Sequence, residues 1–245
     1  MKKLISIFIF FVCVGSLMSQ DKIYFDAYDK ETKDSSIAEC YKKIYTDKTF
    51  TNTVVEKSYY MNGAIKSEIN FSNYKQQIKY GYSKSWYENG QLKEKVLYKE
   101  NKLNDSLITY WPNGNLKRDD YFNMGKLVRG RLYNFDGTAA AHYDYEIAAE
   151  FPGGINQLIK YLSTNVKYPA VARKNGVEGK VFVRFIVDTE GHIQHVEVLK
   201  GVSPEIDAEA MRVVKSMPQW RPAMVDGNKV NSFFNLPLNF KIKDY

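Results

Sequence analysis

The stretch Glu178–Gly201, EGKVFVRFIVDTEGHIQHVEVLKG, contains the clearest β-hairpin signal in the chain. From Gly179 to Val187, apolar residues occupy every second position, a pattern typical of a strand with one buried face. Asp188–Gly191 provides a tight turn, and Ile193–Leu199 returns as the partner strand. The apolar residues of this partner change phase before Val196, which predicts a β-bulge.

Helical spacing precedes this hairpin and follows it. A first helix is predicted at Ile155, Leu158, Ile159 and Leu162, and a second short one opens at Tyr168-Pro169, with Val171 and Ala172 facing inward. After the hairpin, Ser203 is a predicted N-cap and Pro204 the first helical residue. The apolar stripe of this third helix is Ile206, Ala210, Val213, Val214 and Met217.

A final strand alternates through Phe234, Leu236, Leu238 and Phe240. The order helix, helix, strand, strand, helix, strand predicts an α+β fold, with helices packed on one face of a three-stranded antiparallel sheet. Pro237 lies inside the last strand and cannot donate to a ladder, which favours an edge position. An exposed edge strand is a template for another chain.

Internal repeats precede this domain. The turn dipeptides Asn62-Gly63, Asn89-Gly90, Asn113-Gly114 and Asp136-Gly137 place their glycines 27, 24 and 23 residues apart. An aromatic lies four residues before each glycine: Tyr59, Trp86, Tyr110 and Tyr133. Asn-Gly and Asp-Gly favour type I′ turns, so each unit is predicted to be a β-hairpin. A single hairpin is marginal in water, so neighbouring units must pair.

The N-terminus has the pattern of an export signal. Lys2-Lys3 precede an apolar run from Leu4 to Met18, and small residues lead to Ser19. This predicts a cleaved signal peptide, residues 1–19. The alternative is an uncleaved anchor, although the run is shorter than the ~20 residues that span a bilayer. The remaining domains are then a β extension at 20–57, hairpin repeats at 58–140 and the α+β domain at 148–245.

Composition argues for binding rather than catalysis. The formal charge is +7, or +5 without Lys2 and Lys3, and no basic run is interleaved with aromatics, so nucleic acid is not an expected partner. His192 and His195 are three apart in a predicted strand, a spacing that disfavours a metal pair. We find no serine or cysteine with an activating partner, no phosphate loop and no clustered acid–base groups, and predict no enzyme, no cofactor and no metal. Cys40 is the sole cysteine after residue 19, which excludes an intrachain disulfide in the cleaved chain.

The C-terminal residues resemble a known family. Tyr168-Pro169, Val177-Glu178-Gly179, Asp188–Gly191 and Trp220-x-Pro222 occur in the order found in TonB C-terminal domains. The segment WYENGQLKEKVLYKENKL resembles MORN-type repeats of the variant found in YwqK-like antitoxin proteins. The first resemblance implies a periplasmic domain that captures a segment of an outer-membrane TonB-dependent receptor by β-strand addition to its last strand. It also implies inner-membrane motor proteins that supply force for transport.

Two departures leave a second function open. The chain lacks the Pro-rich stretch of energy transducers, and its N-terminal apolar segment looks cleavable. The alternative is an exported scaffold for protein–protein interaction that transduces no force. The localisation expected is periplasmic, or inner-membrane anchored if the segment is retained. Self-association through edge strands is a further expectation.

The resemblance places the peptide site along the last strand, with the Tyr-Pro pair close to its path. Phe233, Asn235 and Asn239 lie on the face opposite the core residues and are expected to read the peptide's side chains. Pro237 has a second interpretation, in which it protects the edge from aggregation. The expected peptide-binding residues are Tyr168, Pro169, Asn231, Ser232, Phe233, Asn235, Pro237 and Asn239.

Overall fold

The computed structural model describes residues 22–28, 30–46 and 53–242. The expected signal peptide at 1–19, and with it the alternative of an anchor, lies outside the described residues. The chain divides into two compact units, residues 1–142 and 143–245, and each is described by itself.

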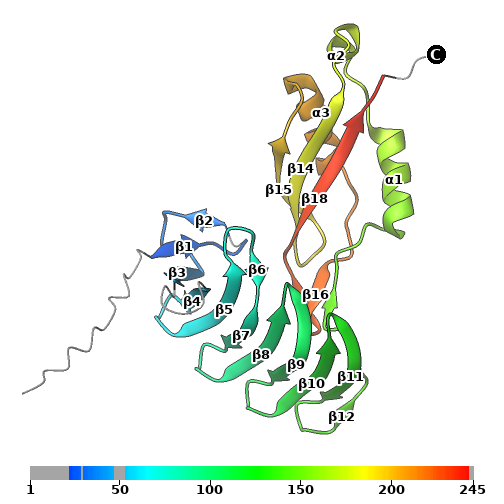
Figure 1. Ribbon diagram of the computed structural model, residues 1–245. Coiled ribbons are helices and arrows are strands. Elements are labelled where there is room, and N and C mark those ends of the chain that lie inside the picture. The colour runs from blue at the N-terminus through cyan, green and yellow to red at the C-terminus, as the bar shows by residue number, and fades with distance from the viewer. Residues whose placement is uncertain (1–21, 29, 47–52, 243–245) are drawn as a thin grey trace, which may run out of the picture. The chain divides into compact units, whose positions relative to one another are not determined.

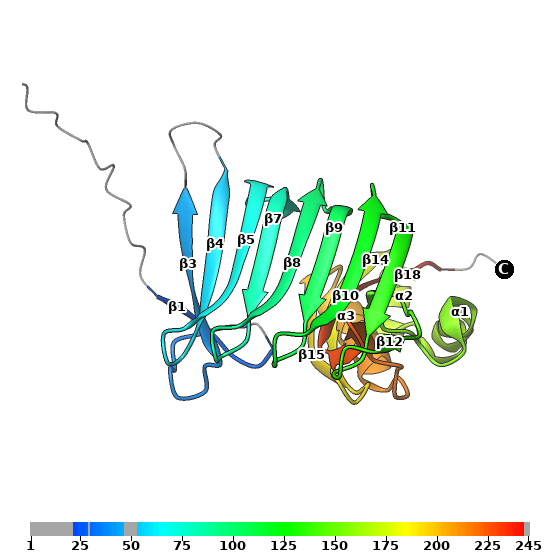
Figure 2. The ribbon, with the colours of Figure 1, turned by 90° about the horizontal axis from the view of Figure 1, so that it is seen from below.

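The N-terminal unit is an antiparallel sheet of twelve strands within the described residues (Figures 1 and 2). Its order is β12-β11-β10-β9-β8-β7-β5-β4-β3-β1-β2, and β6 pairs with β5. Sequence neighbours pair almost throughout, as expected for stacked hairpins. The strands are β1 (Ile23–Phe25), β2 (Glu31–Thr32), β3 (Cys40–Thr46), β4 (Val54–Tyr60), β5 (Ile65–Asn73), β6 (Ile78–Lys79), β7 (Gly81–Trp86), β8 (Leu92–Lys99), β9 (Lys102–Tyr110), β10 (Leu116–Asn123), β11 (Lys126–Tyr133) and β12 (Ala139–Ala140).

The Asn-Gly turns differ from the type I′ prediction. Gly63 has φ +91°, but Asn62 is not among the residues with positive φ, so one residue of the Asn-Gly pair is left-handed rather than both. The Gly63 N–H donates to the Tyr60 carbonyl at 2.9 Å, and Asn62 Oδ1 accepts the Ala64 N–H at 2.9 Å. These bonds, with the register shift beside Tyr59, describe a type I turn followed by a glycine bulge. The Asn side chain fixes that turn by bonding two residues ahead.

Type I′ geometry occurs at the opposite ends of the hairpins. Glu100 and Asn101 both have positive φ and join β8 to β9. Met124-Gly125 does the same between β10 and β11. Sequence reasoning identified the turns at one end of the sheet and missed those at the other, because Glu-Asn and Met-Gly are weak turn signals.

A ladder of aromatic side chains connects successive repeats. Tyr60 donates its hydroxyl to the Trp86 carbonyl at 2.8 Å, Tyr87 donates to the Tyr110 carbonyl at 2.8 Å, and Trp111 Nε1 donates to the Tyr133 carbonyl at 3.0 Å. Each donor lies three residues before the turn glycine of its unit. Each acceptor is the aromatic four residues before the glycine of the next unit. The repeated aromatics therefore join neighbouring hairpins through hydrogen bonds to backbone carbonyls.

One face of this sheet carries a buried ionic cluster. Arg118 and Asp120 are fully buried, and Arg118 Nη1 lies 2.5 Å from Asp120 Oδ2. His142 Nε2 lies 2.9 Å from the other oxygen, Asp120 Oδ1. Gly130 makes room for this ring, because a Cβ there would lie 2.2 Å from His142 Nε2. The cluster ties the last residue of the N-terminal unit to the sheet.

The C-terminal unit is α+β, as the sequence predicts. Its main sheet has the order β15-β14-β18, and a smaller sheet, β13-β16-β17, was not foreseen. The strands of the main sheet, β15, β14 and β18, appear as adjacent arrows in Figure 1. The elements are β13 (Glu146–Ile147), α1 (Gly154–Asn165), α2 (Ala170–Lys174), β14 (Gly179–Val187), β15 (Ile193–Lys200), α3 (Pro204–Lys215), β16 (Ala223–Val225), β17 (Asn228–Val230) and β18 (Ser232–Phe240).

The helices cover one face of the main sheet. The core joins alternate residues of β14 and β18 to α1, α2 and α3, and contains Leu158, Ala172, Val181, Val183, Phe185, Val187, Ile206, Ala210, Val214, Trp220, Leu236, Leu238 and Phe240. Ser203 caps α3 by accepting the Ile206 N–H, with Pro204 as first residue. The bulge in β15 is confirmed by a register shift and by the positive φ of His195.

Two details of the helices differ from expectation. In α1, Leu158 is buried and Leu162 is half-buried, but Ile155 and Ile159 are 64% and 58% exposed. In α2, Ala172 is buried, whereas Val171 is 55% exposed and does not face inward. Both helices turn a narrower apolar face to the sheet than their composition suggests.

Two of the sequence markers meet in space. The Trp220 N–H donates to the Gly191 carbonyl at 2.8 Å. Gly191 has φ +90°, and a Cβ there would lie 1.9 Å from the Trp220 carbonyl oxygen. The β14–β15 turn therefore requires glycine at this position, because the segment after α3 passes directly against it.

Candidate functional site

The outer strand of the main sheet, β18, presents an extended backbone edge. All nine residues of β18 pair with β14, from Ser232 opposite Val187 to Phe240 opposite Gly179. Within the described residues β18 has no partner strand on its other side. The free edge is therefore roughly 27 Å long, at about 3.4 Å per residue, and it offers backbone groups to an added strand.

Pro237 fixes which backbone groups face outward. In an antiparallel strand, the N–H and C=O of one residue point to the same neighbour, and successive residues alternate. Pro237 has no N–H, and pointing it at β14 would cost a ladder bond to Phe182. We infer that Pro237 faces the free edge. Asn235 and Asn239, which share its parity, then direct their N–H groups outward.

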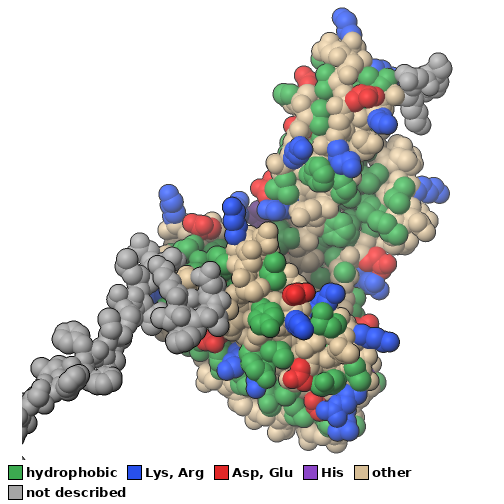
Figure 3. Space-filling view, in the orientation of Figure 1, with side chains coloured by type: hydrophobic (Ala, Val, Ile, Leu, Met, Phe, Trp, Pro, Cys, Tyr) green, Lys and Arg blue, Asp and Glu red, His purple; other side chains and the backbone are tan. Residues whose placement is uncertain are grey.

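The side chains of β18 alternate as the sequence predicts. Leu236, Leu238 and Phe240 are buried in the core, whereas Asn235, Pro237 and Asn239 are exposed on the other face. Phe233 is 56% exposed on the same face. Asn235 Oδ1 accepts from Arg184 Nε at 3.3 Å, and Arg184 Nη1 lies 3.7 Å from Glu197 Oε1. This open face thus carries polar side chains beside apolar ones, and Figure 3 shows hydrophobic and basic side chains interspersed on one face of the unit.

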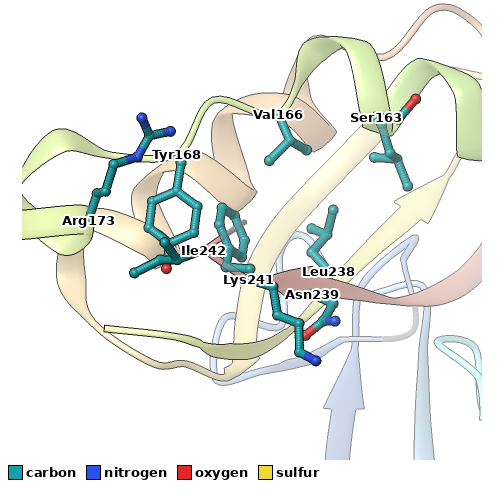
Figure 4. A pocket seen from close by; sticks show the side chains of 10 residues that line it. Ser163, Val166, Tyr168, Arg173, Leu238, Asn239, Lys241 and Ile242 are labelled. Atoms are coloured by element: carbon teal, nitrogen blue, oxygen red, sulfur yellow. The ribbon is translucent and has the colours of Figure 1, made fainter. Parts of the chain in front are cut away.

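A pocket of about 590 Å³ lies beside the C-terminal half of this edge (Figure 4). The end of α1 forms one wall, the Tyr168 region a second, and the end of β18 a third. Its lining residues are Leu162, Ser163, Val166, Tyr168, Arg173, Leu238, Asn239, Phe240, Lys241 and Ile242. The pocket therefore brings Tyr168 and Asn239 together, two of the residues that the sequence assigned to the site.

Tyr168 is held firmly in this wall. Its hydroxyl donates to the Val177 carbonyl, its ring meets Phe240 edge to face at 6.0 Å, and the Arg173 guanidinium lies 5.6 Å from its centroid. Burial, and then the nearby charge of Glu178, raise the pKa of Tyr168, so the phenol stays protonated at neutral pH. Its hydroxyl is a structural donor, and the ring is the part exposed to a ligand.

The loop before Tyr168 is anchored to α3. Glu209 Oε1 accepts the Lys167 N–H at 2.6 Å, and Arg212 Nη2 donates to the Asn165 carbonyl at 2.8 Å. Arg212 Nε also lies 2.7 Å from Glu209 Oε2. Burial alone would raise the pKa of Glu209, but the hydrogen bonds from Arg212 and Lys167 outweigh it and lower this pKa. This ionised pair fixes the loop that carries the Tyr168 wall.

The other expected site residues are spread along the strand. Pro169 precedes α2 as its N-cap residue and does not line the pocket. Asn231 accepts the Thr189 N–H through Oδ1 at 3.2 Å, at the far end of the edge. Ser232 Oγ is buried and has no hydrogen-bond partner among the described residues. Sequence reasoning missed the α1 wall, Arg173 and Lys241, because the signal that α1 flanks the edge is tertiary.

None of the helices among the described residues is long and apolar enough to cross a membrane. Residues 22–28, 30–46 and 53–242 also contain no cluster of three or more His, Cys, Asp or Glu side chains suited to a metal ion.

Comparison with known proteins matches both units. Residues 164–242 match the family described as Gram-negative bacterial TonB protein C-terminal, and residues 53–73 and 79–100 match the MORN repeat variant. Protein TonB of Vibrio cholerae serotype O1 is 31% identical over 80 residues, which cover 31% of this chain and 32% of that protein. The match thus spans about a third of that relative's length.

Two solution structures of the Helicobacter pylori TonB-CTD are also similar. They are 21% and 20% identical, cover 38% and 37% of this chain and 89% and 95% of theirs, and give TM-scores of 0.30 and 0.29. Residues 164–242 thus resemble the Gram-negative TonB protein C-terminal family, and residues 53–73 and 79–100 of the same chain resemble the MORN repeat variant.

Proposed function

We propose that the C-terminal unit binds an extended peptide segment of an outer-membrane receptor by strand addition to β18. The observation that carries this proposal is the free nine-residue edge with a pocket beside its C-terminal half. Main-chain hydrogen bonds supply most of the affinity in this mode, and pockets for alternate side chains supply selectivity. The protein then acts in the periplasm and serves receptor-mediated transport.

The proposed strand has a defined relation to the edge. Residues of the peptide directly opposite Asn235 and Asn239 exchange backbone hydrogen bonds with them. The peptide residue opposite Pro237 can donate its N–H to the Pro237 carbonyl. The carbonyl of that peptide residue has no donor to accept from, because proline lacks an N–H. Peptide side chains opposite Leu238 and Phe240 point toward the pocket wall formed by Leu162 and Val166.

Alternating N-methylation tests strand addition directly. Peptides copied from the periplasm-facing segments of receptors of the same cell are titrated against residues 20–245, with backbone amide shifts as readout. Two series of peptides carry N-methyl groups, one on the odd and one on the even positions. One series should lose binding and the other should bind nearly as well as the parent peptide, because only alternate N–H groups face β18. Equal loss in both series, or shifts confined to the repeats or to α3, would show that the site is elsewhere.

Protein variants provide the matching control. Asn235→Pro removes one outward N–H while leaving the ladder to β14 intact, and should weaken binding about tenfold. Asn235→Ala removes only the side chain and should weaken it about twofold at most. Each variant is first compared with the parent chain by thermal unfolding. Similar losses for both substitutions would point to a side-chain site instead of a backbone one.

A scaffold without force transduction is the second candidate. The repeat sheet favours it, since the described residues before the C-terminal unit form a hairpin array where the resemblance implies a Pro-rich spacer. The two candidates share the peptide edge and differ in their need for an anchor and motor proteins. N-terminal sequencing of the protein from its native cell separates them: a start at Gln20 supports the scaffold, and an intact Met1 supports the anchored transducer.

A further inference from the structure

A row of charged side chains crosses one face of the repeat sheet. The register places Lys43 opposite Lys57, in β3 and β4, and Lys84 opposite Lys95, in β7 and β8. Glu68 of β5 lies between these pairs, opposite both Lys57 and Lys84. Directly opposite residues share a face with Cβ atoms about 5 Å apart. We call these five residues the lysine row; their strands lie side by side in Figure 2.

The lysine row carries an unbalanced charge. Lys57 Nζ lies 2.9 Å from Glu68 Oε2, so one of the four ammonium groups has an acidic partner within the row. Like charges directly opposite one another are destabilising, and this row contains two such pairs. A local conflict of this kind is expected where a function requires it. An anion lying along the row would relieve both repulsions.

Tyrosines lie beneath the lysines on the same face. The Nζ atom of Lys43 lies 6.0 Å from the ring centroid of Tyr59, and Nζ of Lys57 lies 5.7 Å from the ring centroid of Tyr45. Lys95 lies 4.5 Å from the centroid of Tyr82, which is 42% exposed. The hydroxyls of Tyr45 and Tyr59 are 3.3 Å apart. Burial, followed by the hydrogen bond and charge of Tyr45, raises the pKa of Tyr59 to about 12, so its phenol stays a neutral donor.

We propose that the lysine row binds a linear anionic glycan that lies across strands β3 to β8. The row spans four strand spacings, roughly 19 Å, and presents ammonium groups beside phenol hydroxyls. A chain of acidic sugars carries carboxylates and hydroxyls in the same alternation, so charge and hydrogen bonding are both complementary. Nucleic-acid platforms need open aromatic faces for base stacking, whereas these rings have lysines over them. This proposal is independent of the peptide edge.

Polygalacturonate fragments are the probe, titrated by calorimetry against residues 20–245 at low and at physiological salt. Binding should weaken as salt rises, because screening acts on exposed charges. The double variant Lys84→Gln with Lys95→Gln should lose about tenfold in affinity. It should unfold at the same temperature as the parent or a higher one, since a like-charge pair is removed.

A matched control removes two lysine charges from a site outside the lysine row. Lys99 and Lys102 also lie directly opposite each other, at the tip of the β8–β9 hairpin and outside the row. Lys99→Gln with Lys102→Gln should therefore leave affinity for the fragments unchanged. Tyr82→Phe removes a hydroxyl but keeps the ring, and should lower affinity about threefold.

Three competitors decide whether the ligand is a glycan. Polyglutamate tests charge alone, oligothymidine tests nucleic acid, and phosphatidylglycerol vesicles test a lipid surface. Weaker binding of all three, with no effect of Tyr82→Phe on polyglutamate, supports the proposal. Equal or tighter binding of any competitor overturns it. So does an equal loss in the Lys99 and Lys102 control, or no binding of the fragments at low salt.

Discussion

Pro237 lies directly opposite Phe182, one pair from the centre of the pairing between β18 and β14. This one pair sets the phase of the whole edge, because backbone groups alternate from it in both directions. It also interrupts the row of outward donors near the middle of the strand, between Asn235 and Asn239. The edge is therefore a template for strand addition that lacks one hydrogen bond near its centre.

Pro237→Ala should restore the missing outward donor. We expect peptide affinity to rise about threefold, since one net hydrogen bond contributes about 0.5–1.5 kcal/mol. The same change should increase self-association, measured by sedimentation velocity, because the edge becomes a complete template. Increased self-association with no gain in peptide affinity would assign Pro237 to protection of the edge alone.

Tyr60→Phe should weaken the ladder between repeats. The variant leaves the Trp86 carbonyl without its 2.8 Å donor, and we expect about 1 kcal/mol of lost stability in urea unfolding. Tyr80→Phe is the control, because the Tyr80 side chain is 47% exposed, and its effect should stay within about 0.5 kcal/mol. Equal effects of the two substitutions would contradict a role for the ladder.

Asp120→Asn should destabilise the repeat sheet strongly. It removes the carboxylate 2.5 Å from the buried Arg118 guanidinium, and breaking a buried pair by removing one partner costs about 3–5 kcal/mol. Asp119→Asn changes the neighbouring carboxylate on the opposite face and should cost below about 1 kcal/mol. Thermal unfolding of the two variants checks this; a small loss for Asp120→Asn would mean that the cluster tolerates a neutral partner.

Glu209→Gln should show a pH-dependent defect. The folded-state pKa of Glu209 is lowered, so its contribution to stability is fully present above its unfolded value near 4.5 and is lost as pH falls through the folded-state pKa. The variant should be about 1 kcal/mol less stable than the parent at pH 7. The two free energies of unfolding should become equal once the pH falls below the folded-state pKa of Glu209. Urea unfolding from pH 7 to pH 3 measures the gap.

Glu205→Gln is the control for this series. Glu205 lies in the first turn of α3 and is exposed. The free energy of unfolding of the Glu205→Gln variant should therefore stay close to that of the parent from pH 7 to pH 3. Because Glu209 holds the Lys167 N–H, its variant should also shift the amide resonances around Tyr168. A gap that persists unchanged at pH 3 would exclude ionisation as the cause.

The sequence by itself determined the features that depend on neighbours along the chain. Alternation assigned Leu236, Leu238 and Phe240 to the buried face. The phase change between Ile193 and Val196 predicted a bulge, which the structure has at His195. The Ser203-Pro204 start of α3 was predictable for the same reason. Each of these follows from backbone periodicity and capping chemistry, which act within a few residues.

Tertiary structure alone decided the features that join distant segments. Ile159 has the same apolar character as Leu158, yet it is exposed, because the sheet covers only one side of α1. The Tyr60 bond to Trp86 spans 26 residues, and the pocket joins Val166 to Leu238 across 72 positions of sequence. Periodicity specifies which side of an element is apolar, but it carries no information about which element packs against it. The free edge was therefore predictable from Pro237, and its pocket was not.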